Sequence, residues 1–521
     1  PRKENDRAAD EAEQRYHDVV HAVDQQYFAT TVTVTFDAAT REELNDRAAD
    51  VRNFFLALHD ARVERETVSA DRVLRETWPF HVPRRSSRAP LMLLTGEIVS
   101  LLPLFTAWTG SPNPVRILRT TAGEPFAFDP ADASLQSAQH TGIFGKNGTG
   151  KSVVAQTLLV LTGLLKGDVD YCVLDSQWSY RRTAAIFGGA FFEAGDQSPH
   201  AVNAFALPSA FRLLPQGEQD EFVAARIAMG VELVLTLGHT DPRDDGTWRA
   251  IVSAVLTPLL RTAATDGREL LLRDVRAGLL QYQNPELAHY EQAARELATR
   301  LRPYVYEERA PGDWVPGQYA RLFDRPQSYD GGTTQYLVAD LNKVKLGDPA
   351  ILSAFVVAIV QGLFYERVVS NRVGREGRAT RWIMDECMSY LKNRAFREEA
   401  IRALREGRKM RNGVAFLLQG YGDDRHADYG DFALAFKPNL VHRIMLLHDR
   451  NAKATRDALH EDGLDHFAEK LFGLHQQRGY VSEAIISQSA GATTRHADIL
   501  IELDPFEYWA TTTDPEDTKV E

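Results

Sequence analysis

The segment Gly145-Lys-Asn-Gly-Thr-Gly-Lys-Ser152 constrains the fold of this chain more than any other feature of its sequence. It satisfies the pattern GxxxxGK[ST], follows the apolar residues 141–144 and opens the apolar run 153–165. A strand, a glycine-rich turn and a helix in this order form a P-loop, in which bare backbone N–H groups cradle phosphates at a helix N-terminus. The segment therefore predicts a nucleotide-binding α/β domain.

Each residue type in this loop has a chemical role. Glycines let consecutive N–H groups turn toward the phosphates, Lys151 reaches the β- and γ-phosphates, and the Ser152 hydroxyl binds Mg²⁺. We therefore expect ATP and Mg²⁺ as cofactors, with Lys151 also serving catalysis. The residues expected to line the nucleotide are Gly145, Asn147, Gly148, Thr149, Gly150, Lys151 and Ser152.

A second segment, residues 381–386 (Arg-Trp-Ile-Met-Asp-Glu), supplies the acidic partner that Mg²⁺ requires. Three apolar residues predict a buried strand, and two carboxylates follow at its C-terminal end, where ligands bind in open α/β sheets. We expect Asp385 to hold Mg²⁺ through water and Glu386 to orient or deprotonate the attacking water. The alternative for this pair is a solvated strand end.

Further candidates for the catalytic site follow other predicted strands and one helix. Gln419 ends the apolar run 414–418 and can sense the γ-phosphate or hold the lytic water; the alternative is an ordinary strand terminus. Arg408 lies in a predicted helix, 395–411, and can stabilise transition-state charge in a neighbouring subunit; the alternative is a solvated basic helix. Asp175, at the end of another predicted strand, either supports the site or is a turn residue.

Length and composition limit the other functions. The chain has 521 residues, roughly three times a typical domain of ~150, so two or more domains are expected. Its net charge of −12 argues against a surface that grips nucleic acid throughout, although the window 371–412 holds 12 Lys and Arg against 6 Asp and Glu, a net +6. Two cysteines without a CxxC motif predict neither a disulfide nor a zinc site, and they fit a reducing compartment.

The order of predicted elements indicates two parts. Residues 1–110 are expected to form a small α+β domain, with strands at 27–36 and 62–68, a helix at 40–58, and a beginning that lies upstream of Pro1. Residues 111–521 alternate strands and helices, which predicts βαβ units and a mainly parallel sheet with an α-helical insertion at about 208–305. The apolar runs 153–165 and 351–364 are shorter than the ~20 residues that cross a bilayer and are predicted to be buried helices. The expected sheet strands are 139–144, 170–175, 335–341, 381–385, 414–419 and 443–447.

Taken together, these motifs resemble those of the large conjugation ATPases of type IV secretion systems. This is the TraC/TrbE type, whose founding relative is the fourth VirB component, within the HerA/FtsK-like P-loop ATPases. The resemblance covers roughly residues 90–521. Besides the P-loop and the acidic pair, it rests on the segments 101–110, 173–180, 187–189, 203–205, 317–324, 407–409, 418–419 and 503–513.

The resemblance implies a RecA-like core that hydrolyses ATP with Mg²⁺ and assembles as a homo-hexamer at the cytoplasmic face of the inner membrane. It implies a function in powering pilus biogenesis and substrate transfer, together with other type IV secretion components, including inner-membrane subunits and the coupling protein. By position, it implies a Walker A pair, a Walker B pair, a sensor glutamine and a trans-acting arginine at Lys151 and Ser152, Asp385 and Glu386, Gln419, and Arg408.

Two other functions remain open at this point. One is a double-stranded DNA translocase or coupling protein of the same superfamily, which would contact DNA and show DNA-stimulated, salt-sensitive hydrolysis. The other is a scaffold that binds ATP only to organise a secretion complex, against which the carboxylate of Glu386 and the amide of Gln419 argue.

Overall fold

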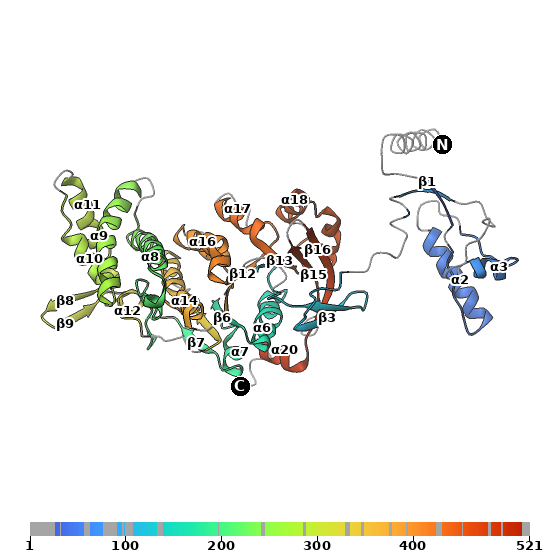
Figure 1. Ribbon diagram of the computed structural model, residues 1–521, viewed down its shortest axis with the longest axis horizontal. Helices are drawn as coiled ribbons and strands as arrows, with labels where there is room; N and C mark the ends of the chain where they lie inside the picture. Colours follow the sequence, from blue (N-terminus) through green and yellow to red (C-terminus); the bar gives the residue numbers. More distant parts are fainter. Residues whose placement is uncertain are drawn as a thin grey trace. The chain divides into compact units, whose positions relative to one another are not determined.

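The computed structural model describes residues 27–512 except for 32, 57–62, 77–90, 96–97, 99–107, 133–138, 196, 241–244, 285–287, 329–333, 345–348, 375–377, 392–393, 424–429, 451, 478–480 and 491–492. The chain divides into two units, Pro1–Ala107 and Trp108–Glu521. Their helices and strands are labelled in Figure 1. Part of the segment 101–110, which contributes to the family resemblance, lies outside the described residues.

The first unit combines a two-stranded antiparallel sheet with helices. Strand β1 (Tyr27–Thr30) pairs with β2 (Leu91–Leu94), and the helices are α2 (Arg41–Leu56) and α3 (Ala70–Glu76). The predicted helix at 40–58 is confirmed, and its first turn is capped because the Glu43 N–H donates to Thr40 Oγ1 (3.2 Å). The predicted strand 27–36 is too long and the strand at 62–68 is wrong. Only 27–30 have a partner strand, and alternation without one does not form a sheet.

The second unit is built on a 12-stranded sheet. The neighbouring strands β13-β5-β12-β11-β6-β10-β7 run parallel, and β15, β16, β3 and β4 continue the sheet antiparallel beyond β13. Their bounds are β3 (Arg116–Thr120), β4 (Pro125–Phe128), β5 (His140–Phe144), β6 (Val169–Asp175), β7 (Ala190–Glu193), β10 (Tyr336–Asp340), β11 (Ala379–Met384), β12 (Asn412–Leu418), β13 (Leu440–Met445), β14 (Gln476–Gln477), β15 (Val481–Ala490) and β16 (Thr493–Glu502).

Both faces of the parallel strands are buried, so successive side chains enter two different cores. In β6, Tyr171 and Val173 pack with the helix that follows the P-loop, whereas Cys172 and Leu174 pack in the core that also contains the helical insertion. This two-sided burial explains why the strands appear in the sequence as continuous apolar runs. All six predicted sheet strands are present, and the mainly parallel α/β class is confirmed.

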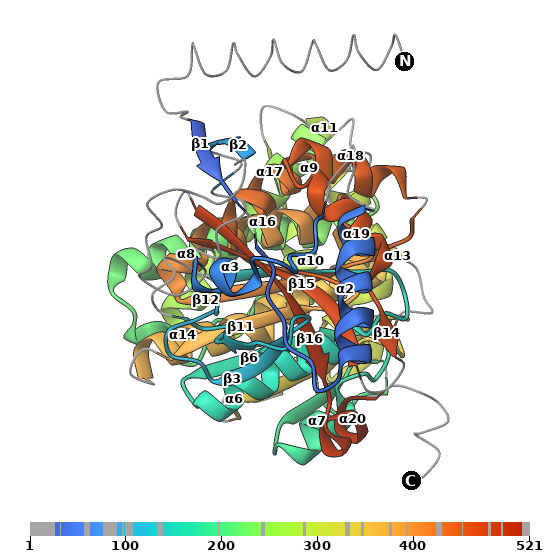
Figure 2. The ribbon, with the colours of Figure 1, turned by 90° about the vertical axis from the view of Figure 1, so that its right-hand side faces the viewer.

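The helices cover both faces of this sheet, as Figure 2 shows from a second direction. The P-loop is followed without a break by α5, η1 and α6, and a second long helical run consists of α13, η5 and α14. The bounds are α5 (Lys151–Val154), η1 (Ala155–Leu161), α6 (Thr162–Lys166), α7 (Arg181–Ile186), α13 (Pro349–Ile359), η5 (Val360–Phe364), α14 (Tyr365–Gly374), α15 (Met388–Leu391), α16 (Arg394–Met410), α17 (Gly430–Asn439), α18 (Lys453–Glu461), α19 (Ala468–Gly473) and α20 (Pro505–Thr511).

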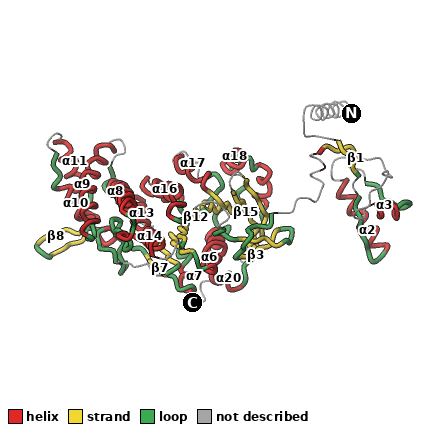
Figure 3. The backbone as a smooth tube through the Cα atoms, viewed as in Figure 1, coloured by secondary structure: helices red, strands yellow, loops and turns green. Residues whose placement is uncertain are grey.

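The predicted helical insertion follows β7. Helices α8 (Gln216–Leu237), α9 (Asp245–Asp266), α10 (Leu272–Leu280) and α11 (Ala288–Arg300) pack together and are followed by the hairpin β8–β9 (Tyr306–Ala310 and Asp313–Pro316). In Figures 1 and 3 these elements lie at one end of the second unit, and β15, β16 and β3 lie at the other. The insertion therefore lies beyond the β7 end of the sheet.

The apolar run that begins at residue 351 forms a buried helix, as predicted. In the described part of the chain, Ile351–Val373 is the one helix long and apolar enough to cross a membrane, and 94% of its most apolar window is buried inside the structure. It packs against α8 and α16. Its hydrophobicity is therefore accounted for by the core of the second unit.

Candidate active site

The P-loop lies between β5 and α5, and its backbone is tied to both neighbouring strands. The Gly145 N–H donates to the carbonyl of Leu418 at the end of β12 (3.2 Å), and the next N–H donates to the carbonyl of Leu447 just after β13 (3.1 Å). Gly148 and Gly150 have φ values of 78° and 83°, which residues with side chains rarely adopt. The loop is therefore anchored at its base and reverses direction at its glycines.

Close packing also requires the first glycine. The Thr149 side chain is buried, and its hydroxyl donates to the carbonyl of Lys146 (2.8 Å), which closes the loop from within. A Cβ at Gly145 would lie 2.7 Å from that hydroxyl oxygen, so a larger residue there would displace it. Asn147 and Gly148 are exposed at the tip.

Lys151 lies folded against its own loop. Its Nζ donates to the carbonyl oxygens of Gly145 (2.9 Å) and Lys146 (3.2 Å). Burial lowers the pKa of Lys151, while the charges of Asp385 and Glu386 oppose that shift. The ammonium thus occupies the centre of the P-loop, where its bonds to neutral carbonyls can be exchanged for bonds to phosphate oxygens.

Asp385 is brought to Ser152, as the sequence predicts for a metal site. It follows β11, is 4% exposed, and its Oδ1 accepts from the Glu386 N–H (2.9 Å). Its Oδ2 is buried without a hydrogen-bond partner among the described residues. Burial raises the pKa of Asp385, and the nearby Ser152 hydroxyl opposes that shift. A buried carboxylate oxygen without a partner, next to a hydroxyl, is a donor set that suits Mg²⁺.

Glu386 follows Asp385 in the sequence, but its side chain is hydrogen-bonded to the loop after another strand, β6. Its backbone is left-handed, with φ 52°. Its Oε2 accepts from Ser176 Oγ (2.8 Å), and its Oε1 accepts from the Gln177 side-chain amide. Both donors follow β6, which is the neighbour of β11 on the side opposite β12. The carboxylate is therefore held toward β6.

Two more carboxylates lie at the same edge of the sheet. Asp175 ends β6 and accepts hydrogen bonds from the N–H groups of Ser176 (2.7 Å) and Gln177 (3.2 Å). Burial, together with the charges of Asp385 and Asp340, raises the pKa of Asp175 to about 7. Asp340 ends β10, and burial raises its pKa as well. Asp175 thus braces the loop after β6.

Gln419 is exposed just after β12, at the edge that carries the P-loop. The loop after Gln419 is bonded to a residue that follows β13, because His448 Nε2 accepts a hydrogen bond from the Tyr421 N–H (2.9 Å). Burial lowers the pKa of His448 to about 4, so the ring is neutral and can accept this bond. Asp423 in this loop is close enough to Lys151 for that lysine to lower its pKa, although burial raises it more. The role of Gln419 as a sensor stays a prediction.

Arg408 lies far from the P-loop of its own chain. It is exposed in the last turn of α16, which leads into the amino end of β12, while the P-loop neighbours the carboxyl end of that strand. A strand of this length spans roughly 20 Å. Arg405 is exposed on the same helix. The structure therefore separates Arg408 from Lys151, Asp385, Glu386 and Gln419, which it brings together.

Sequence reasoning missed several residues of this edge. Ser176, Gln177 and Asp423 follow β6 and β12, so the rule that sites form at the carboxyl ends of parallel strands could have indicated them. His448 follows β13 in the same way. Gln476 of β14, whose side chain donates to Gly148 O (3.2 Å), had no such signal because β14 belongs to the antiparallel part of the sheet.

Comparisons with known proteins place the fold. A scan against protein-family models matches none, and a search of curated proteins finds no match. Among solved structures, the chain is similar to VirB4 of Thermoanaerobacter pseudethanolicus, with 16% identity and a TM-score of 0.57 over 76% of this chain and 99% of that one. The chain therefore has the RecA-like α/β fold of that protein, and the predicted fold class is confirmed.

Weaker similarity extends to the plasmid coupling protein TrwB in complex with a non-hydrolysable ATP analogue. The identity is 18% and the TM-score 0.45, over 74% of this chain and 89% of that one.

Proposed function

We propose that this chain is an ATPase that energises a type IV secretion or conjugation apparatus. The observation that carries the proposal is the meeting of Lys151, Ser152 and Asp385 at one sheet edge, with a buried Asp385 oxygen that has no hydrogen-bond partner in the described part of the chain. The likeness of the fold to VirB4 supports the choice of apparatus. Pilus biogenesis and substrate transfer are the processes that such a motor would drive.

The residues of this edge suggest a division of roles. Backbone N–H groups of residues 145–150 and the Lys151 ammonium would bind the phosphates, and Ser152 with Asp385 would hold Mg²⁺. When bound, Mg²⁺ neutralises phosphate charge and fixes the phosphate geometry. Glu386 would accept a proton from the attacking water, and Gln419 would orient that water. Lys151 must exchange its present bonds to the carbonyls of its own loop for bonds to phosphate.

Steady-state ATP hydrolysis tests this proposal. Lys151→Ala should lower the rate at least about 100-fold, because the cation that stabilises transferring charge is removed. Lys409→Ala is the matched control, since Lys409 is an exposed lysine of α16 that pairs with Glu221. Glu386→Gln should still bind ATP and hydrolyse it slowly. Normal turnover in Lys151→Ala would refute the site, and normal turnover in Glu386→Gln would remove Glu386 as the base.

We further propose that the active form is a ring, with six copies as the resemblance implies, at the cytoplasmic face of the inner membrane. Arg408 is exposed and remote from its own P-loop. It could therefore contact bound nucleotide only in the active site of a neighbouring copy. Arg408→Ala should then bind ATP normally and lose about 10³-fold in rate. The wild-type rate should rise more than linearly with protein concentration. A fully active monomer would contradict the ring.

The same assay separates the motor of a secretion apparatus from a DNA pump. The carboxyl end of α16 exposes Arg405, Arg408 and Lys409, which could meet DNA phosphates. We expect the rate to change little when double-stranded DNA is added. A large DNA stimulation that falls steeply with salt would favour a DNA translocase or coupling protein instead.

A further inference from the structure

The loop after β6 makes a contact with Glu386 that no step of the proposed reaction requires. Ser176 Oγ donates to Glu386 Oε2 (2.8 Å), and the Gln177 side-chain amide donates to Glu386 Oε1. The partners are separated by 210 and 209 positions in the sequence, respectively. These two donors reach different oxygens of the carboxylate, so its rotation is restrained from both sides.

The strand order determines in which direction the carboxylate is held. The strands lie in the order β5-β12-β11-β6, so the P-loop after β5 and the Ser176–Gln177 pair after β6 lie on opposite sides of Glu386. The bonds to Ser176 and Gln177 therefore hold the carboxylate on the side of β11 that faces away from the P-loop. To act on a water beside bound phosphate, the carboxylate would have to leave these donors.

The two donors differ in how easily their hydrogen bonds to Glu386 can break. Ser176 is fully buried, and its N–H is held by Asp175 Oδ1 (2.7 Å), so its place is fixed. Gln177 is exposed, so its bond to Glu386 competes with water. The next residue, Trp178, is 42% exposed with φ 59°, and its N–H donates to Asp340 Oδ2 (2.9 Å). The backbone of this loop is thus braced by two buried aspartates, while the Gln177 side chain is free to exchange.

We propose that Gln177, supported by Ser176, is a latch that holds Glu386 in a withdrawn position and lowers the basal rate of hydrolysis. Gln177 is a positioning residue, because it acts through Glu386. The latch rests on the proposed function, since it regulates the same reaction.

A Gln177 variant, a double variant and a matched control test the latch in the full chain. Gln177→Ala should raise kcat on the order of tenfold with KM for ATP nearly unchanged, because a hydrogen bond to a charged group is lost. Gln283→Ala, at an exposed glutamine of the helical insertion, is the matched control and should leave kcat unchanged. Gln177→Ala combined with Glu386→Gln should be as slow as Glu386→Gln alone.

Gln177→Glu provides a readout that loss of packing would not produce. It has nearly the same shape as glutamine, removes the donor and places a like charge beside Glu386, so kcat should rise at least as much as in Gln177→Ala while KM for ATP stays unchanged. If the wild type is active and Gln177→Ala is no faster while it is folded, the latch is overturned and the proposed function stands. If the wild type and Gln177→Ala both bind ATP and neither hydrolyses it, the proposed function is overturned together with the latch.

Discussion

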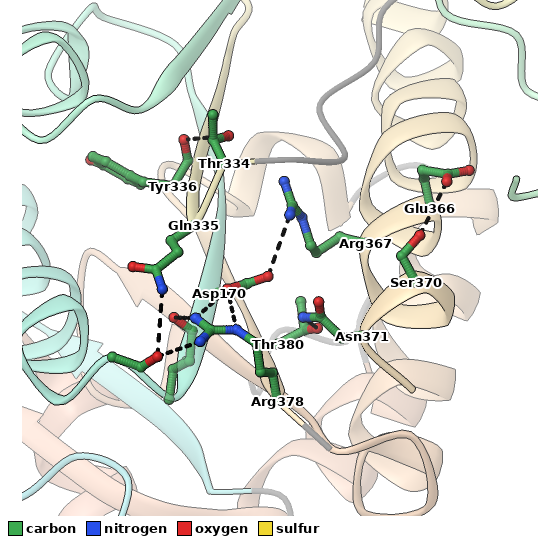
Figure 4. A network of polar contacts seen from close by, with 12 residues as sticks. Asp170, Thr334, Gln335, Tyr336, Glu366, Arg367, Ser370, Asn371, Arg378 and Thr380 are labelled. Atoms are coloured by element: carbon green, nitrogen blue, oxygen red, sulfur yellow. Dashed lines mark hydrogen bonds and ion pairs between the residues drawn. The ribbon is translucent and has the colours of Figure 1, made fainter. Parts of the chain in front are cut away.

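Buried carboxylates have opposite surroundings at the two edges of the same sheet, where the amino ends and the carboxyl ends of the parallel strands lie. At the amino edge, Asp170 of β6 is fully buried between two arginines: Arg367 Nη1 lies 3.3 Å from its Oδ2, and Arg378 Nη2 lies 2.6 Å from its Oδ1. Figure 4 shows this network, with Asn371 and Thr380 joined beside it (3.1 Å). At the carboxyl edge, Asp175 of the same strand accepts hydrogen bonds from backbone N–H groups.

The two edges differ in how closely arginine or lysine side chains pair with the buried carboxylates. Arg367 is 2% exposed and Arg378 20%, so the amino edge is a closed ion-pair network. At the carboxyl edge, burial raises the pKa values of Asp175, Asp340 and Asp385. Buried carboxylates whose charge is only partly offset cost stability, and they are retained where they bind a cation or a reacting group. The comparison therefore supports a structural role for the first edge and a binding role for the second.

Replacing one carboxylate at each edge should give the largest effects and should separate a role in activity from a role in stability. Asp385→Asn should lower ATP hydrolysis more than about 100-fold, because a hard oxygen ligand is lost. Its urea midpoint should equal or exceed that of the wild type, since a buried carboxylate whose charged form burial disfavours is removed. A fall in stability without loss of activity would assign Asp385 to structure.

Asp170→Asn should show the reverse pattern. It leaves Arg367 and Arg378 without their counter-charge in a buried place, which costs about 3–5 kcal/mol of unfolding free energy. Chemical denaturation measures this loss. Any activity that remains in the folded fraction should match the wild type in KM. A normal midpoint would show that the network contributes little.

Asp175 should make stability depend on pH. Its folded pKa of about 7 lies above the ordinary value of 3.8, so between these values the folded chain binds the proton more tightly than the unfolded chain does. The unfolding free energy should therefore fall as pH rises through this window, by about 2 kcal/mol between pH 5 and 7. Urea titrations at several pH values should show this slope, and Asp175→Asn should flatten it. An equal slope in both proteins would contradict the assignment.

Arg378→Lys should give the smallest change. The lysine keeps the charge near Asp170, but it loses the fork by which Arg378 Nε (3.0 Å) and Nη2 (2.6 Å) reach the same carboxylate oxygen. We expect a loss of about 1 kcal/mol, measured by denaturation. A loss as large as that of Asp170→Asn would mean that the fork geometry matters more than the charge.

Much of the fold was predictable because local patterns carried it. Six of the seven parallel strands that the structure describes were visible as apolar runs. The P-loop was visible as a motif, and Asp385 and Gln419 were visible as polar residues at strand ends. The strand β7 and the β15–β16 hairpin were missed because short or half-exposed strands have no comparable pattern. The proposed strand at 62–68 failed because local alternation does not supply a partner strand.

The sequence by itself determined where nucleotide chemistry can occur, because glycine spacing and the residues that end each strand are properties of neighbouring positions. Only the tertiary structure decided which strand ends meet. Asp170 finds its arginines 197 and 208 positions away, and Glu386 finds Gln177 209 positions away. Strand order depends on how all the helices and strands bury their apolar faces at once, and no short segment carries that information. For this reason the pairing of β6 with β11, and with it the restraint on Glu386, appeared only in the folded chain.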